Sequence, residues 1–160
     1  RDANDINVEK ITPDPNCPNP GSFYNPFYKW TQQLINLRKK YSALRISGFN
    51  PIETEQFRWL LGPWLKPEQG QDEKVIGWQT KDIDNGTEMF VLLNFAKQEL
   101  QVVLEFEAQT SQWAQLADLK QVTDFKTEKL LTASNVLQVK NNKIKFTLPA
   151  YSGYIYKKIK

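Results

Sequence analysis

The chain has 160 residues, of which 40% are hydrophobic and 24% are charged, so its composition predicts a folded globular body. Lysine and arginine exceed aspartate and glutamate by only 21 to 18 and are scattered, so nucleic acid is not an expected partner. No apolar run nears the roughly 20 residues of a membrane span, so a membrane is not an expected partner either. Because the chain has no histidine, a Ser-His-Asp or Cys-His catalytic set and a histidine-ligated metal are excluded. Because it has a single cysteine, an internal disulfide is excluded as well. We expect no metal and no cofactor.

The first 21 residues are rich in proline, asparagine and aspartate. Four prolines within residues 12–21 rule out a helix or a central strand there, so the pattern predicts a long loop. Asp2 and Asp5 in this loop are candidate substrate-binding residues, although loops also use Asp and Asn for purely structural turns. No signal peptide is recognised at Arg1, and the localisation stays open.

A single amphipathic helix is predicted next, over residues 25–42. Asn25 fits the N-cap and Pro26 the first helical position, where its missing N–H costs nothing. Apolar residues then recur at spacings of three and four and form one stripe along the helix: Phe27, Trp30, Leu34, Leu37 and Tyr41, with Ile35 widening it. Such a stripe needs a partner surface, because an isolated helix of this length is marginal in water.

After Ser42 the hydrophobic period changes from helical to alternating. A short strand is predicted at 44–49, and further strands at 75–78, 89–95, 100–106, 136–139, 144–148 and 154–156. Asn85-Gly86 and Asn141-Asn142 indicate hairpin turns, because these residues readily adopt positive φ. Residues 53–73 are interpreted as a long loop or insertion, and 111–131 mix strand and turn signals. The fold class is therefore mainly β, an antiparallel β-sandwich preceded by a long loop and one amphipathic helix.

Tryptophan is the residue type that points most directly to a ligand. Trp59 and Trp64 lie in the 53–73 segment and are candidate sugar-stacking residues, whereas Trp30 and Trp78 fit a buried stripe and a strand. Asn85-Gly86-Thr87 also matches a glycosylation sequon, but a hairpin tip explains every residue of it.

The order of these segments resembles the C-terminal region of the α-amylase family of glycoside hydrolases. Residues 27–45, with Leu-Ile-Asn-Leu-Arg followed by Ala-Leu-Arg, resemble the last barrel helix of that family. The run 90–95, ending in Asn-Phe, resembles a strand of its C-terminal β-domain, and 148–156 resembles the closing strand. The segment 53–73 is longer and more aromatic than the usual link, which leaves α-amylase, pullulanase-type debranching enzyme and α-glucosidase open.

The resemblance implies a division of the chain. Residues 1–42 would be the last loop and helix of a (β/α)8 barrel, and 43–160 the appended antiparallel β-sandwich domain. The family's catalytic Asp and Glu and its substrate-binding His lie upstream, so no catalytic residue is carried over and this chain alone is not expected to be an enzyme. The loop at 1–21, with Asp2 and Asp5, would border the substrate cleft.

The function that this division implies is a non-catalytic C-terminal domain of a starch- or glycogen-acting hydrolase of amylase or pullulanase type. It would pack on and stabilise the catalytic barrel of the same parent chain. The alternative is a carbohydrate-binding module that recognises α-glucans through Trp59 and Trp64. A third possibility is an unrelated interaction domain that docks through the helix stripe.

Overall fold

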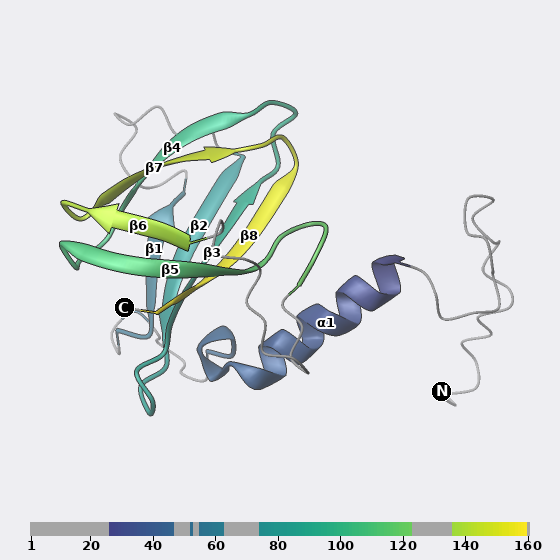
Figure 1. The fold of residues 1–160 in the computed structure, drawn as a ribbon, viewed down its shortest axis with the longest axis horizontal. Coiled ribbons are helices and arrows are strands. Elements are labelled where there is room, and N and C mark those ends of the chain that lie inside the picture. The colour runs from purple at the N-terminus through teal and green to yellow at the C-terminus, as the bar shows by residue number, and fades with distance from the viewer. Residues whose placement is uncertain (1–25, 47–51, 53–54, 63–73, 123–135, 160) are drawn as a thin grey trace, which may run out of the picture.

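The computed structural model describes residues 26–46, 52, 55–62, 74–122 and 136–159 (Figure 1). The predicted loop 1–21, with Asp2 and Asp5, and the candidate Trp64 lie outside the described residues. Within the described part, one helix, α1 (Pro26–Lys40), is followed by a short 3-10 helix, η3 (Ser42–Leu44). The strands are β1 (Phe57–Leu61), β2 (Val75–Lys81), β3 (Glu88–Asn94), β4 (Leu100–Glu105), β5 (Thr110–Ala117), β6 (Val136–Lys140), β7 (Lys143–Leu148) and β8 (Ser152–Lys158).

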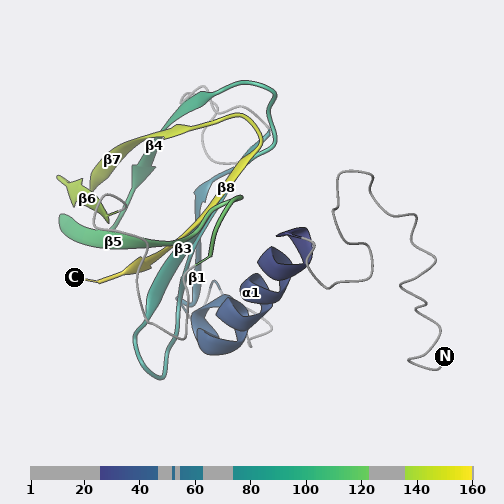
Figure 2. The ribbon, with the colours of Figure 1, turned by 45° about the vertical axis from the view of Figure 1, so that its right-hand side comes forward.

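All described strand pairs are antiparallel and form one sheet in the order β1-β2-β3-β8-β5-β6-β7-β4. The sheet curves over on itself, so that β4, β6 and β7 face β1, β2 and β3 across a shared interior (Figures 1 and 2). The mainly β, antiparallel fold class predicted from the sequence is confirmed. The two layers expected of a sandwich are the two halves of one nearly closed sheet.

The inner face of the rolled sheet holds one apolar core. Its centre is Phe90 on β3, whose ring stacks on Tyr156 of β8 with centroids 4.7 Å apart and meets Trp113 of β5 edge-on at 4.9 Å. Burial raises the pKa of Tyr156, so this phenol stays protonated and donates to Gln115 Oε1 at 3.1 Å. The other buried members of this core are Leu60, Leu61, Val75, Leu92, Leu104, Phe106, Val139 and Leu148.

Both predicted hairpin turns are confirmed, with one difference in backbone conformation. Asn141 and Asn142 have φ of 52° and 55°, which is the pair of left-handed residues that a two-residue hairpin prefers. In the β2–β3 connection only Gly86 has a positive φ, at 69°. The longer connection, residues 82–87, therefore needs one left-handed residue rather than two.

Two predictions about loops and strands are wrong. No strand begins at residue 44, because Ser42–Leu44 form η3 and bury Ala43 against the sheet; residues 47–49 of that predicted strand lie outside the described residues. The segment 53–73 is not only a loop, because residues 57–61 form β1 and pair with β2. The unassigned segment 111–131 begins with β5, which is paired on both sides.

Asn94, at the end of β3, joins that strand to the β7–β8 turn. Its amide nitrogen donates to the carbonyls of Leu148 at 3.2 Å, Pro149 at 2.8 Å and Gln98 at 3.1 Å, and its Oδ1 accepts from Ala96 N at 2.8 Å. The side chain is 2% exposed. Buried backbone groups therefore depend on this one amide.

Replacing Asn94 with aspartate should destabilise the fold by about 3 kcal/mol or more, because the variant loses the donor and places a carboxylate against three carbonyl oxygens. Chemical denaturation of both proteins measures this loss. The same change at Asn36, which is exposed on α1, should alter stability by about 0.5 kcal/mol or less. Equal effects at the two positions would contradict the role of the Asn94 amide.

Candidate functional site

The predicted helix stripe packs on the outer face of the sheet. Leu37 is fully buried there, and the indole nitrogen of Trp30 donates to the carbonyl oxygen of Asp118 at 2.8 Å. Figure 2 shows α1 beside the sheet rather than apart from it. The buried residues of this helix–sheet contact are Leu37, Ala43, Met89, Leu116, Ala117 and Val122, with Trp30, Leu34, Tyr41, Leu44 and Ile155 partly buried around them. The partner surface that the stripe requires is thus the β-sheet.

Ile35 was expected to widen the stripe, and this is wrong. Its side chain is 50% exposed, and the neighbouring Asn36, Arg38 and Lys39 are exposed as well. The helix–sheet contact is narrower than the predicted stripe, because only the side of α1 that carries Trp30, Leu34 and Leu37 meets the sheet. Among the side chains of α1 that are described, those of residues 29–40, Ile35 is the large apolar one that is left half exposed.

A polar contact ties the end of the helix region to the β2–β3 turn. The Ser42 hydroxyl donates to the carboxylate of Asp82, whose other oxygen accepts from Asp84 N at 2.9 Å. Asp82 is only 8% exposed. The hydrogen bond from Ser42 is the main cause that lowers the pKa of Asp82 below its usual range, against the opposing effect of burial.

This contact predicts a pH dependence of stability. Because the folded state lowers the pKa of Asp82, its contribution is complete above about pH 4 and is lost as the pH falls through the lowered value. Asp82→Asn should reduce the melting temperature at neutral pH, and the difference from wild type should shrink below about pH 4. Asp84→Asn is the control, because it removes an exposed charge from the same turn and leaves in place the Asp82 carboxylate that accepts from Ser42. A difference that stays constant in acid would contradict this assignment.

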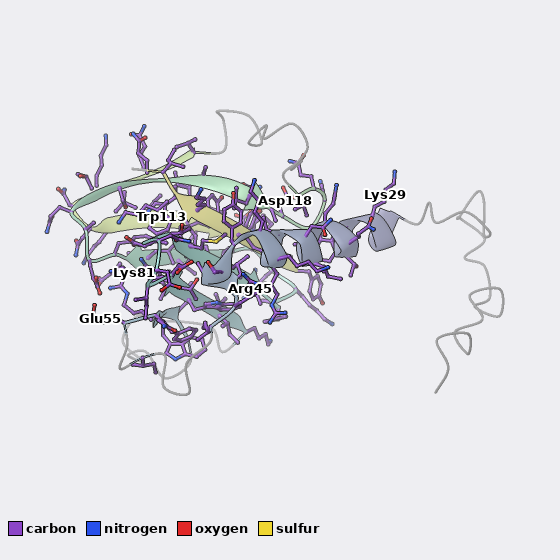
Figure 3. All side chains as sticks on the ribbon, turned by 90° about the horizontal axis from the view of Figure 1, so that it is seen from below. Lys29, Arg45, Glu55, Lys81, Trp113 and Asp118 are labelled. Carbon is purple, nitrogen blue, oxygen red and sulfur yellow. The ribbon has the colours of Figure 1, made fainter. Side chains whose placement is uncertain are left out.

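A hollow of about 330 Å³ lies at the end of β1, β2 and β3. It is lined by Ile52, Glu55, Phe57, Arg58, Gln79, Thr80, Lys81, Glu88 and Glu107. Glu55 and Lys81 lie at the same end of the molecule when it is seen from below (Figure 3). The size is at the small end of the roughly 300–1,000 Å³ that ligand clefts occupy.

A chain of hydrogen bonds runs across four strands, and three of its four residues line this hollow. Arg58 of β1 donates to Gln79 Oε1 of β2 at 2.9 Å, and Gln79 Nε2 donates to Glu88 Oε2 of β3 at 2.8 Å. The other oxygen of Glu88 accepts from Lys158 Nζ of β8 at 2.7 Å. We call Arg58, Gln79, Glu88 and Lys158 the polar ladder. Gln79 pairs with Phe90 in register, so the ladder lies on the inner face, next to the apolar core.

Arg58 also connects the two edge strands of the sheet. Its Nη1 atom lies 3.4 Å from Glu107 Oε1. Its Nη2 atom, which donates to Gln79, also donates to the Glu105 carbonyl at 3.2 Å, just where β4 ends. The Arg58 side chain therefore bridges β1 and β4, which are not paired with each other by backbone hydrogen bonds. Because Arg58 is held by several partners, its position beside the hollow is fixed.

Among the carboxylates around the hollow, Glu88 has both oxygens engaged by protein groups, so it is suited to holding the ladder rather than to proton transfer or attack. Within the described ranges, no group of three or more His, Cys, Asp and Glu side chains is arranged to hold a metal ion. Thr80 is 2% exposed, and its hydroxyl oxygen has no hydrogen-bond partner there. None of the helices in the described part is both long and apolar enough to span a membrane.

Of the candidate binding residues from the sequence, Trp59 is the one that the structure describes. It is partly buried on β1, opposite Trp78 of β2, and its ring meets that of Phe57 edge-on at 4.7 Å. Phe57 lines the hollow and Trp59 does not. The ladder residues were missed by sequence reasoning, because β1 itself was taken for a loop.

The fold is similar to part of several solved enzymes. A pullulanase from Group B Streptococcus has a TM-score of 0.59 and 20% identity over 82% of this chain and 16% of its own. An α-amylase from Geobacillus thermoleovorans, solved with acarbose, has a TM-score of 0.57 and 12% identity over 92% of this chain and 26% of its own. An isomaltulose synthase variant from Erwinia rhapontici, solved with D-glucose, has a TM-score of 0.51 and 16% identity over 87% and 19%.

These likenesses confirm, at the level of fold, the resemblance to the α-amylase family that the sequence predicts. The chain spans between 16% and 26% of the length of these enzymes, as expected of one domain of a longer protein. A scan of protein-family models finds no match to the chain, and a search of curated proteins finds none either.

Proposed function

We propose that this chain is the non-catalytic C-terminal β-domain, with the last barrel helix, of an α-glucan-acting glycoside hydrolase of amylase or pullulanase type. Residues 1–42 would belong to the barrel and 43–160 to the β-domain, which packs on the barrel and stabilises it. The observation that supports the proposal is the helix–sheet contact centred on Leu37, in which α1 would be the barrel helix and the sheet would be the C-terminal domain.

The contact explains how stabilisation would work. If α1 is part of the barrel wall, the barrel cannot lose that helix without also exposing the apolar face that α1 shares with β3, β5 and β8. Each large side chain in such a contact contributes about 1.5–3 kcal/mol when it is removed from water. The hydrogen bonds Trp30–Asp118 and Ser42–Asp82 also fix the position of the helix region relative to the sheet.

Two measurements test this proposal. The isolated chain should show no turnover of starch or pullulan, and reproducible turnover that follows the purified protein would contradict a non-catalytic role. In the longer enzyme, removal of the residues after Lys40 should shorten the half-life of activity on heating, because α1 would then expose its buried stripe. A truncated enzyme that is as heat-resistant as the intact one would contradict the stabilising role.

The second candidate function is a carbohydrate-binding module. It is favoured by the partial exposure of Trp59 next to the Phe57 ring, and by the α-glucan chemistry of the similar pullulanase, which has been solved with maltotetraose. Titration with maltooligosaccharides should then change tryptophan fluorescence, and Trp59→Ala or Trp64→Ala should reduce the change. A chain whose fluorescence does not respond would contradict binding through these residues.

A further inference from the structure

Asn85-Gly86 is the one Asn-Gly pair in the sequence, and the proposed function gives it no role. Such a pair is chemically labile, because glycine has no side chain to keep its backbone nitrogen away from the asparagine side chain. Both residues are exposed in the β2–β3 turn, and nothing beyond the chain neighbours of Gly86 lies within 4 Å of the place a side-chain carbon would take. Crowding therefore does not protect the pair.

The reaction open to this pair is an internal attack that releases ammonia. The Gly86 backbone nitrogen gives up its proton and attacks Cγ of Asn85, and the side-chain nitrogen of Asn85 takes up a proton and leaves as ammonia. The product is a succinimide ring. Water then adds to one of the two ring carbonyls and breaks its bond to the Gly86 nitrogen, which leaves aspartate or isoaspartate at position 85. Water is the only other reactant.

Hydrogen bonds engage both reacting groups in the folded turn. The Gly86 N–H donates to the Asp82 carbonyl oxygen at 2.9 Å, and Asn85 Oδ1 accepts from Thr87 N at 2.9 Å. The Asn85 side chain also donates to the Asp82 carboxylate. The Gly86 nitrogen can lose its proton and reach Cγ only after these bonds break, so the rate of the reaction depends on how often the turn opens.

Asp82 connects the opening of this turn to the helix region. Its carboxylate accepts from the Ser42 hydroxyl of η3 and from Asp84 N at 2.9 Å, while its backbone N–H donates to the Thr87 carbonyl at 2.9 Å. Ser42 therefore stabilises the closed turn from outside it. In the converted chain, a carboxylate at position 85 would replace a donor to Asp82 and add a third negative charge beside Asp82 and Asp84, which opposes closure of the turn.

We propose that Asn85 is a site of slow conversion to aspartate and isoaspartate, that the Ser42–Asp82 contact restrains the conversion, and that the conversion in turn weakens this contact. Covalent change at the tip of one hairpin would thus loosen the attachment of the helix region to the sheet as the protein ages. Neither effect depends on whether the chain belongs to a barrel enzyme.

The first measurement is the rate of conversion in the isolated chain, kept in mildly alkaline buffer and followed by mass spectrometry of the peptide that contains Asn85. The folded chain should convert about tenfold more slowly than the chain in concentrated urea. Ser42→Ala should raise the folded rate about threefold, as expected from the loss of one hydrogen bond. Thr147→Ala, which removes a hydroxyl group from an exposed position on β7, should leave the rate within about 1.5-fold.

These rates support the proposal if they follow that order. No conversion at Asn85 in the folded chain, equal rates in the folded and unfolded chain, or a rate that Ser42→Ala leaves unchanged would overturn it. Asn85→Gln identifies the reacting side chain, because its longer side chain would have to close a larger ring, and it should abolish the mass change in this peptide.

The second measurement tests the reverse effect with Asn85→Asp, which carries the charge of the product. It should lower the melting temperature by about 2–4 °C in the wild-type background. In the Ser42→Ala background the loss should be less than half as large, because the contact that it weakens is already missing. Asn141→Asp, the same change in the other hairpin turn, should have equal effects in both backgrounds. Strictly additive effects of Asn85→Asp and Ser42→Ala would contradict the coupling.

Discussion

Replacing Phe90 with alanine should lower the free energy of unfolding by about 3–5 kcal/mol, a large part of the total for a domain of this size. The Phe90 side chain is fully buried and lies at the centre of the rolled sheet. Its ring touches Tyr156, Trp113 and Phe106, with centroids 4.7, 4.9 and 5.5 Å away. Removing the ring leaves a cavity where the two halves of the sheet meet, and rigid aromatic neighbours cannot close it.

Equilibrium unfolding in urea, followed by near-ultraviolet circular dichroism, measures this effect, because Trp113 and Tyr156 report on the packing around Phe90. The matched control is Phe95→Ala, which removes the same ring from a side chain that is 56% exposed just beyond the same strand. The control should change stability by about 0.5 kcal/mol or less. If both variants lose the same stability, the core is not centred on Phe90.

Local patterns in the sequence are sufficient for α1 and for most of the strands. The three-and-four spacing of Trp30, Leu34, Leu37 and Tyr41 is a property of one continuous segment, and the structure places those four side chains in one contact. The alternation at 100–104 likewise predicts β4, where Leu104 is buried and Val103 is exposed. Such elements bury one side only, which is why their period is visible.

β5 was not predicted, because it is buried on both sides. Trp113 points into the inner core, while Ala114 and Leu116 face the opposite side, where Leu116 joins the helix–sheet contact. A strand covered on both faces loses the alternation that marks a half-buried strand. β1 was missed for a different reason. It is an edge strand that is only partly buried at residues 57–59, and its inner side carries the polar Arg58, which bonds to Gln79 and Glu105.

The hollow and the polar ladder could not be predicted from sequence spacing. Arg58, Gln79, Glu88 and Lys158 come from four strands and meet only because of the strand order and register. In the sequence, each appears as an ordinary polar residue. The exposure of Ile35 has a related cause, because the width of the buried stripe depends on the surface of the sheet and not on the helix alone.

Replacing Leu37 with alanine should destabilise the chain by about 2–5 kcal/mol. Leu37 is fully buried between α1 and the sheet, in contact with the cluster that contains Met89 and Leu116. The truncated side chain leaves a void in the surface that holds the helix against the sheet. Loss of helix signal at 222 nm before loss of the near-ultraviolet signal from Trp113 would show that α1 detaches first, since Trp113 lies in the other core.

Ile35→Ala is the matched control for this prediction, because it also removes an apolar side chain from α1, but one that is half exposed. In the isolated chain the control should cost about 0.5 kcal/mol or less. In the longer enzyme, Leu37→Ala should shorten the half-life of activity whether or not the barrel covers Ile35. Ile35→Ala should shorten it only if the barrel covers Ile35. Equal stability of both variants in the isolated chain would mean that α1 is not held by the sheet, and the proposed role of the β-domain would fail with it.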